Sequence, residues 1–158
     1  MIRRMAVVMM VVTLTAGGAL AQKKGAIKPV VTVVPAAVKA GEKVEVKVTL
    51  NLGSGLHINS NQPEDEFAIA TDLKMSDAAG LVIEAPRYPA GKKHTYSYAP
   101  KGLTVYEGKV EIAVPVQVKK DTKPGQYPLK GRLTFQPCDA DVCYPPEKAD
   151  VAATVQVK

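Results

Sequence analysis

The stretch Val44-Glu45-Val46-Lys47-Val48-Thr49-Leu50 alternates apolar and polar side chains without a break. A period of two is typical of a β-strand that has one buried face and one wet face. The same alternation returns over Val110–Val118. Pro115 lies inside this second run and predicts an edge strand or a bulge, because proline cannot donate a ladder hydrogen bond. Together the two runs indicate a protein built from sheets.

Shorter runs of the same kind extend this pattern along the chain. The further strands that we expect are Val30–Val34, Leu56–Ile58, Thr71–Met75, Leu81–Ala85, Tyr127–Phe135 and Ala149–Val157. The segment Pro86–Gly102 is rich in proline, glycine and tyrosine and is expected to be a loop. About eight short strands separated by turns predict an all-β protein with an immunoglobulin-like antiparallel β-sandwich.

The first residues have the features of an export signal. Arg3 and Arg4 precede an apolar run over residues 5–14, and Ala19-Leu20-Ala21 then offers a cleavage site. As a helix this run would rise only about 15 Å, half of the roughly 30 Å hydrocarbon core of a bilayer. We therefore expect a signal peptide at 1–21, a flexible leader at 22–28 and one domain at 29–158. The mature protein is expected to be periplasmic and not anchored in the membrane.

The composition excludes several classes of function. The 158 residues include 21 Lys+Arg and 15 Asp+Glu, for a formal net charge of +6, and the lysines are scattered among acids. Nucleic-acid binding requires a concentrated basic face, so no such partner is expected. The two histidines, His57 and His94, give no metal-ligand spacing, and no motif for a bound cofactor is present. We expect neither a metal nor a cofactor.

The two cysteines are the strongest chemical signal. Cys138 and Cys143 lie between two expected strands, and an exported protein allows them to pair. The loop they would close is short, so the disulfide would stabilise the fold by roughly 2 kcal/mol. A structural staple and a redox-active pair both remain open. Asp139 and Asp141 disfavour a thiolate, which indicates a reductant rather than a strong oxidant.

The surroundings of the cysteines resemble those of a known family. Phe135-Gln136-Pro137-Cys138 and Cys143-Tyr144-Pro145-Pro146-Glu147 are similar to the active-site hairpin of the N-terminal periplasmic domain of DsbD, a thiol:disulfide interchange protein. Weaker matches lie upstream, at Gly55–Asn61, Arg87–Pro89 and Val105–Ile112. The resemblance covers nearly the whole mature chain.

This resemblance implies an immunoglobulin-like domain whose cysteine pair cycles between disulfide and dithiol. By position Cys143 matches the cysteine that forms mixed disulfides with partners, and Cys138 matches the resolving cysteine. The implied partners are thioredoxin-like periplasmic proteins and a membrane electron conduit. Neither a conduit nor a thioredoxin-like domain is found within these residues, so both are expected to be separate proteins.

The resemblance also implies a groove around the cysteines. Tyr106 matches the tyrosine of a cap loop that shields the pair in that family, although Val105 stands where a capping phenylalanine is expected. His57 and Tyr144 are expected to line the same groove. The spacing between the two cysteines is one residue shorter than in the best-known member.

The sequence thus predicts thiol–disulfide exchange that relays reducing equivalents through a Cys-x4-Cys pair. Whether this amounts to protein-disulfide reductase-like catalysis stays open. The alternative is a non-enzymatic immunoglobulin-like binding or assembly module whose disulfide only pins a hairpin. Two surface features could serve either function. The four tyrosines Tyr88, Tyr96, Tyr98 and Tyr106 would cover a sheet edge or dock a partner. Glu64-Asp65-Glu66 is typical of a solvated loop, with a docking patch as its alternative.

Overall fold

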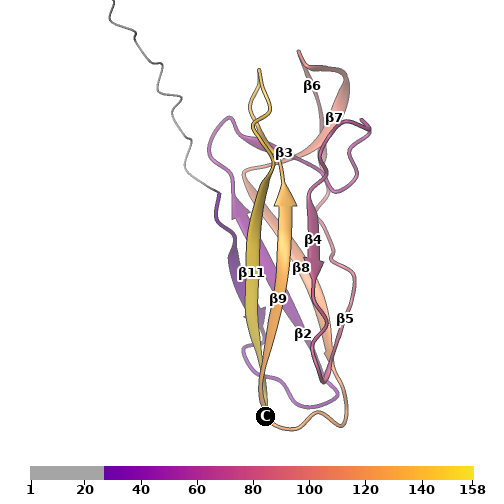
Figure 1. The fold of residues 1–158 in the computed structure, drawn as a ribbon, viewed down its shortest axis with the longest axis vertical. Coiled ribbons are helices and arrows are strands. Elements are labelled where there is room, and N and C mark those ends of the chain that lie inside the picture. The colour runs from indigo at the N-terminus through magenta and orange to yellow at the C-terminus, as the bar shows by residue number, and fades with distance from the viewer. Residues whose placement is uncertain (1–26) are drawn as a thin grey trace, which may run out of the picture.

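The computed structural model describes residues 27–158, which form an elongated stack of β-strands (Figure 1). The signal peptide expected at 1–21 and most of the leader expected at 22–28 lie outside the described residues. Residues 27–158 contain no helix, and therefore none that could cross a membrane. The all-β, immunoglobulin-like antiparallel sandwich expected from the sequence is confirmed.

Three sheets make up the structure, and every pairing between named strands is antiparallel. The first sheet has the order β1 (Val30–Val34), β2 (Lys43–Asn51), β8 (Lys109–Val118) and β5 (Leu81–Ile83). The second has the order β11 (Glu147–Val157), β9 (Gly125–Phe135) and β4 (Asp72–Met75). The third has the order β10 (Pro137–Cys138), β3 (His57–Asn59), β7 (Ala99–Glu107) and β6 (Lys92–Tyr96).

The main core lies between the first two sheets. On β2 the apolar members of the alternating stretch are buried, and on β8 their partners in register are buried too: Val46 pairs with Val114 and Val48 with Ile112. The second sheet contributes Leu133 and Phe135, both 0% exposed. Because side chains alternate across each strand, the polar residues between these positions face water. The period of two seen in the sequence is therefore the inside–outside pattern of the sandwich.

Pro115 lies on an interior strand, so the edge position considered from the sequence is wrong. β8 is paired with β2 on one side and with β5 on the other. Pro115 accepts a hydrogen bond from the backbone N–H of Glu84 at 2.9 Å, one residue beyond the end of β5. A residue of an antiparallel strand directs its N–H and C=O to the same neighbour. The ring nitrogen of Pro115, which has no hydrogen to donate, therefore faces the chain just beyond the end of β5, where no regular strand pairing requires a donor.

The prediction that Pro86–Gly102 is a loop is also wrong in part. β6 occupies Lys92–Tyr96, and β7 begins at Ala99, so the second half of this segment is a hairpin with a register shift between His94 and Tyr96. The sequence Lys-Lys-His-Thr-Tyr of β6 has no alternating apolar face, and the strand is largely exposed. Pairing with β7, rather than burial of its own side chains, makes this segment a strand.

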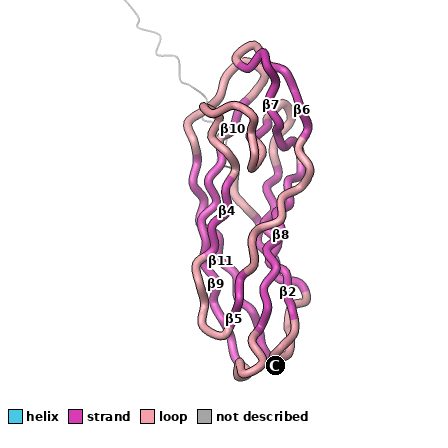
Figure 2. Tube along the Cα trace, turned by 90° about the vertical axis from the view of Figure 1, so that its right-hand side faces the viewer, coloured by secondary structure: helices cyan, strands magenta, loops and turns pink. Residues whose placement is uncertain are grey.

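The third sheet forms one end of the molecule. β7 is followed directly by β8 through Gly108, which adopts a positive φ of 64° that other residues rarely adopt. In Figure 1 the hairpin between β9 and β11 and the β6–β7 hairpin both lie at the end opposite the C-terminus. Figure 2 shows β10, β6 and β7 at that same end. This end carries both cysteines.

Candidate functional site

Cys138 and Cys143 form a disulfide across a short hairpin. Their Cα atoms are 4.0 Å apart, and the two residues form an antiparallel bridge. Backbone hydrogen bonds flank the bridge on both sides, from Asp139 to Val142 at 2.9 Å and from Tyr144 to Pro137 at 2.8 Å. The cysteines are therefore a non-hydrogen-bonded pair, the position at which facing residues of antiparallel strands come closest. The local backbone pairing brings the two sulfurs together.

The two cysteines differ sharply in exposure. Cys138 belongs to β10 and is 0% exposed, whereas Cys143 lies in the returning segment and is exposed. β10 pairs with β3, so Cys138 lies within the third sheet, and Cys143 lies outside these strands. A reagent or a protein that approaches the disulfide meets Cys143 first.

Asp139 holds the turn between the cysteines. Its Oδ1 accepts hydrogen bonds from the backbone N–H groups of Asp141 and Val142, both at 3.0 Å. Its Oδ2 accepts a hydrogen bond from the hydroxyl of Tyr144. From the sequence Asp139 was interpreted only as a negative charge beside the thiols; in the structure its carboxylate is the organising centre of the hairpin. Tyr144, predicted to line the groove, lies beside the disulfide and fixes this turn.

His57 and an aromatic stack lie beside Cys138. His57 is directly opposite Cys138 in the pairing of β3 with β10 and is 3% exposed. Its ring stacks on Tyr96 with centroids 4.3 Å apart, and Tyr96 stacks on Tyr98 at 5.2 Å. The Tyr98 hydroxyl lies 2.9 Å from His57 Nε2 and 3.2 Å from the carbonyl oxygen of Asp139. The turn between β6 and β7 is thereby tied to the cysteine hairpin.

The donors in this network can be assigned from the acceptors. The Asp139 carbonyl can only accept, so the Tyr98 hydroxyl donates to it, and the Tyr98 oxygen is left to accept from His57 Nε2–H. Burial lowers the pKa of His57 below its usual range, and this effect outweighs the opposite effect of Glu107. Burial also raises the pKa of Tyr98 to about 12. At neutral pH the site therefore holds a neutral imidazole and a protonated phenol.

The family follows from comparison of the sequence with protein-family models. Residues 25–154 match the model described as "Thiol:disulfide interchange protein DsbD, N-terminal". This chain belongs to the DsbD N-terminal family. The resemblance seen at the cysteine hairpin is thus confirmed over nearly the whole described chain. No curated protein matches the sequence.

Solved structures with the same fold include other DsbD N-terminal domains. The reduced form from Neisseria meningitidis is 21% identical, with a TM-score of 0.52, over 82% of this chain and 86% of that chain. The complex between the DsbD N-terminal and the PilB N-terminal domains of that species gives 24% identity and a TM-score of 0.50, over 85% and 87% of the two chains. A type I cohesin–dockerin complex from Clostridium thermocellum gives 14% identity and a TM-score of 0.50, over 85% and 100%. These likenesses show a shared fold.

Within this DsbD N-terminal-family domain, Tyr106 lies on a different face from Cys138. In the third sheet Tyr106, Ile58 and Pro137 form one row in register, and Glu107, His57 and Cys138 form the next. Neighbouring rows point to opposite faces. Tyr106 is 3% exposed, packs in the main core, and exchanges hydrogen bonds with Asn61.

The contact of Tyr98 with the cysteine hairpin is the feature of the site that sequence reasoning missed. Tyr98 was grouped with the other tyrosines of the segment expected to be a loop, and only the β6–β7 hairpin places its hydroxyl beside Asp139. The aromatic pair Tyr96 and Tyr98, spaced two apart on one hairpin, was the available signal. Val105, expected at the position of a capping residue, is 0% exposed and belongs to a second small core with Ala99 and Leu103.

The chemistry available at this site is that of the disulfide itself. Among residues 27–158 no group of three or more His, Cys, Asp or Glu side chains could hold a metal ion. A disulfide with one accessible sulfur can accept a thiolate and release the other sulfur.

Proposed function

We propose that this domain relays reducing equivalents by thiol–disulfide exchange at the Cys138–Cys143 pair. The observation that carries the proposal is the unequal exposure of the two cysteines: Cys143 is exposed, and Cys138 is 0% exposed. A pair that serves only as a staple has no need of this asymmetry, whereas exchange needs one sulfur that a partner can reach. The shared family, described as thiol:disulfide interchange, supports the same function.

In the first half of the cycle the domain is reduced. A thiolate of a reduced donor attacks Sγ of Cys143, a bond forms between donor and Cys143, and the Cys138–Cys143 bond breaks. Cys138 leaves as a thiolate and takes up a proton. The donor's second thiolate then attacks the donor's first sulfur and releases Cys143, which takes up the second proton. Two electrons and two protons have moved to the pair, and the donor has become a disulfide.

In the second half the domain passes these electrons on. The Cys143 thiolate attacks a disulfide of an acceptor and forms a mixed disulfide, and the departing acceptor sulfur takes up a proton. Cys138 then attacks Sγ of Cys143, which restores the internal disulfide and releases the reduced acceptor. The pairing of Cys138 with Cys143 in the hairpin keeps the resolving sulfur next to the reacting one. This arrangement gives the internal attack the advantage of proximity.

We propose thioredoxin-like periplasmic proteins as the donors and acceptors, with a separate membrane conduit as the ultimate source of electrons. The complex of a DsbD N-terminal domain with a PilB N-terminal domain supports a protein partner for this fold. Export to the periplasm would follow from the signal segment at 1–21. Disulfides form and persist in that compartment, which is consistent with the pair being oxidised.

The experiment that tests the proposal is reduction of the folded, oxidised protein by a thioredoxin-like domain. We expect complete reduction within minutes at micromolar protein, followed by maleimide labelling of two cysteines in the wild type. The Cys138→Ala/Cys143→Ala variant is the control for non-specific oxidation of the donor. A disulfide that stays intact for hours, while dithiothreitol reduces it readily, would instead support the alternative of a structural pin in a binding module.

A further inference from the structure

The loop between β3 and β4 presents an aromatic side chain to solvent on a rigid support. Phe67 is 85% exposed, far more than any other large apolar residue described. Its neighbour Ala68 packs instead against the small core formed by Ala99, Leu103 and Val105. The backbone thus buries the small side chain and directs the large one outward. Single exposed apolar side chains are common on protein surfaces, but this aromatic ring is the most exposed large apolar side chain among the described residues and lines a groove.

The base of this loop is closed by hydrogen bonds. Ser60 accepts from the backbone N–H of Thr71 at 3.1 Å, and the Thr71 hydroxyl donates to the Asn59 carbonyl at 2.6 Å. All three residues are buried. The loop therefore has its two ends close together, as in the compact surface loops that often carry function.

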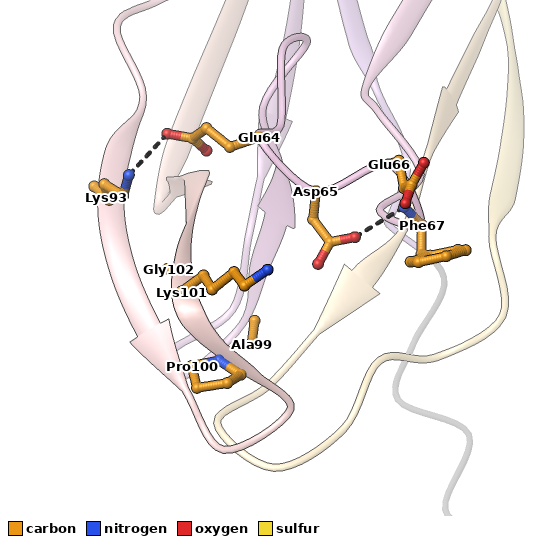
Figure 3. Close-up of a pocket in the computed structure, with 9 residues that line it drawn as sticks. All are labelled: Glu64, Asp65, Glu66, Phe67, Lys93, Ala99, Pro100, Lys101 and Gly102. Carbon is orange, nitrogen blue, oxygen red and sulfur yellow. Dashed lines mark hydrogen bonds and ion pairs between the residues drawn. The ribbon is translucent and has the colours of Figure 1, made fainter.

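The tip of the loop is held as well. Glu64 accepts from the backbone N–H of Thr104 at 2.9 Å and from its hydroxyl at 2.8 Å, and Lys93 lies 3.4 Å away. Asp65 accepts from the backbone N–H of Phe67 at 2.8 Å. Figure 3 shows Glu64 directed toward Lys93 on one side of the loop and Phe67 at the other. These bonds hold the backbone at Phe67 before any partner arrives, which reduces the backbone entropy lost on binding.

Two sets of contacts connect this loop to the residues around the disulfide. A groove of about 530 Å³ lies between Phe67 and the start of β7 at Ala99. Tyr98, the residue before Ala99, donates a hydrogen bond to the Asp139 carbonyl. On the other side, Asn59 Nδ2 donates to the Ile69 carbonyl at 3.0 Å and lies 3.5 Å from Gln136 Oε1.

Gln136 continues this second set of contacts to the cysteine hairpin. Its Nε2 donates to the carbonyl of Tyr144, the residue after Cys143, at 3.0 Å. A protein that reaches Cys143 would therefore extend over the same end of the domain. Next to Cys143 the exposed Val142 adds further apolar surface.

From this geometry we infer that Phe67 is the anchor by which a thioredoxin-like redox partner docks beside the Cys138–Cys143 disulfide. The inference rests on the proposed function. The fitting partner presents an apolar pocket next to its own reactive cysteine. Basic side chains on one edge of that pocket would face Asp65 and Glu66 beside Phe67, and acidic side chains on the other edge would face Lys93 and Lys101 across the groove. Aromatic anchors that fill a pocket commonly carry a large part of the binding energy of such an interface.

The test compares a protein donor with a small one. The substitution Phe67→Ala should lower the second-order rate constant of reduction by about tenfold or more with the exported thioredoxin-like domains of the same organism as donors. The rate with dithiothreitol should stay unchanged, because a small dithiol needs no docking surface. Phe67→Leu should restore part of the loss. The matched control is Val82→Ala on β5, which removes another exposed apolar side chain, 47% exposed, from a different part of the molecule.

The outcomes separate this inference from the proposed function. If the wild type exchanges with a protein donor and Phe67→Ala does so equally fast, the inference is overturned while the function stands. An equal loss with dithiothreitol would also overturn it, since the variant would then have damaged the disulfide site. A wild-type dimer that Phe67→Ala dissociates would assign the surface to a second copy of this chain. Failure of the wild type with every protein donor would overturn the proposed function itself.

Discussion

His57 Nε2 lies 2.9 Å from the hydroxyl of Tyr98, and this hydroxyl donates a hydrogen bond to the backbone carbonyl of Asp139, the residue after Cys138. One phenol thus connects β3, the β6–β7 turn and the cysteine hairpin. Cys138 lies in register with His57 and is 0% exposed. We interpret Tyr98 as a side chain that limits access of reagents to the sulfur of Cys138 and leaves the sulfur of Cys143 accessible.

This role of Tyr98 can be tested by alkylation of the reduced protein. Tyr98→Ala should raise the rate at which Cys138 reacts with a maleimide by at least a few fold and should change Cys143 little. Tyr98→Phe keeps the ring and should have a smaller effect. Mass-spectrometric mapping of timed samples distinguishes the two thiols. Tyr106→Phe should leave both rates unchanged; acceleration by that variant alone would place the cap at Tyr106, as the sequence resemblance implies.

Stability should depend on pH through His57. Because burial lowers the pKa of His57 in the folded protein from its ordinary 6.5, the unfolded chain binds this proton more readily. The free energy of unfolding should therefore fall as the pH drops below 6.5, and the fall should end once the pH passes the folded-state pKa. One proton limits the slope to about 1.4 kcal/mol per pH unit.

Urea denaturation between pH 5 and 8 measures this dependence. His57→Gln should flatten the curve below pH 6.5, because glutamine binds no proton in this range. An imidazole NMR titration of His57 with a midpoint at or above 6.5 would contradict the argument.

Reduction should weaken the domain without unfolding it. The disulfide joins residues only 5 apart in sequence, so its removal should lower the free energy of unfolding by roughly 2 kcal/mol, out of a typical total of about 5–15 kcal/mol. Chemical denaturation with and without reductant measures the difference, and Cys138→Ala/Cys143→Ala serves as a permanently unbridged form. Loss of the folded state on reduction would favour the structural alternative.

The roles of the two cysteines predict which variant traps a partner. Cys138→Ser leaves the exposed Cys143 able to form a mixed disulfide that no resolving thiol can release, so a covalent complex with a thioredoxin-like protein should accumulate. Cys143→Ser leaves only the buried sulfur and should trap little. Non-reducing gels of the purified pair give the answer. Accumulation with Cys143→Ser instead would reverse the assigned roles.

The loop that carries Phe67 should loosen at low pH. The hydrogen bonds from Thr104, with Lys93 nearby, lower the pKa of Glu64 from its ordinary 4.5 to about 2. The folded state therefore gains from this carboxylate above pH 4.5 and loses that gain as the pH falls toward 2. The amide resonance of Thr104 should titrate with a midpoint near the lower value and should not titrate in Glu64→Gln. A midpoint near 4.5 would show that the hydrogen bonds from Thr104 to Glu64 are absent in solution.

The sequence by itself determined the strands whose side chains alternate. β2 and β8 have a strict period of two because each has one face in the core and one in water, and a local pattern suffices to reveal it. The pairing of Cys138 with Cys143 and the family were also readable, because the cysteines and their neighbours are contiguous in the chain.

Only the tertiary structure decided which side chains meet at the site. β6 is a strand because it forms hydrogen bonds with β7. The residues of β6 have no alternating apolar pattern from which a strand could be predicted. Tyr98 rather than Tyr106 reaches the cysteine hairpin because the register of β3 with β7 turns Tyr106 toward the core. The unequal exposure of the two cysteines arises in the same way, since β3 pairs with the strand of Cys138 and with no residue of the returning segment. Registers and strand neighbours depend on residues far apart in the chain, and no local pattern encodes them.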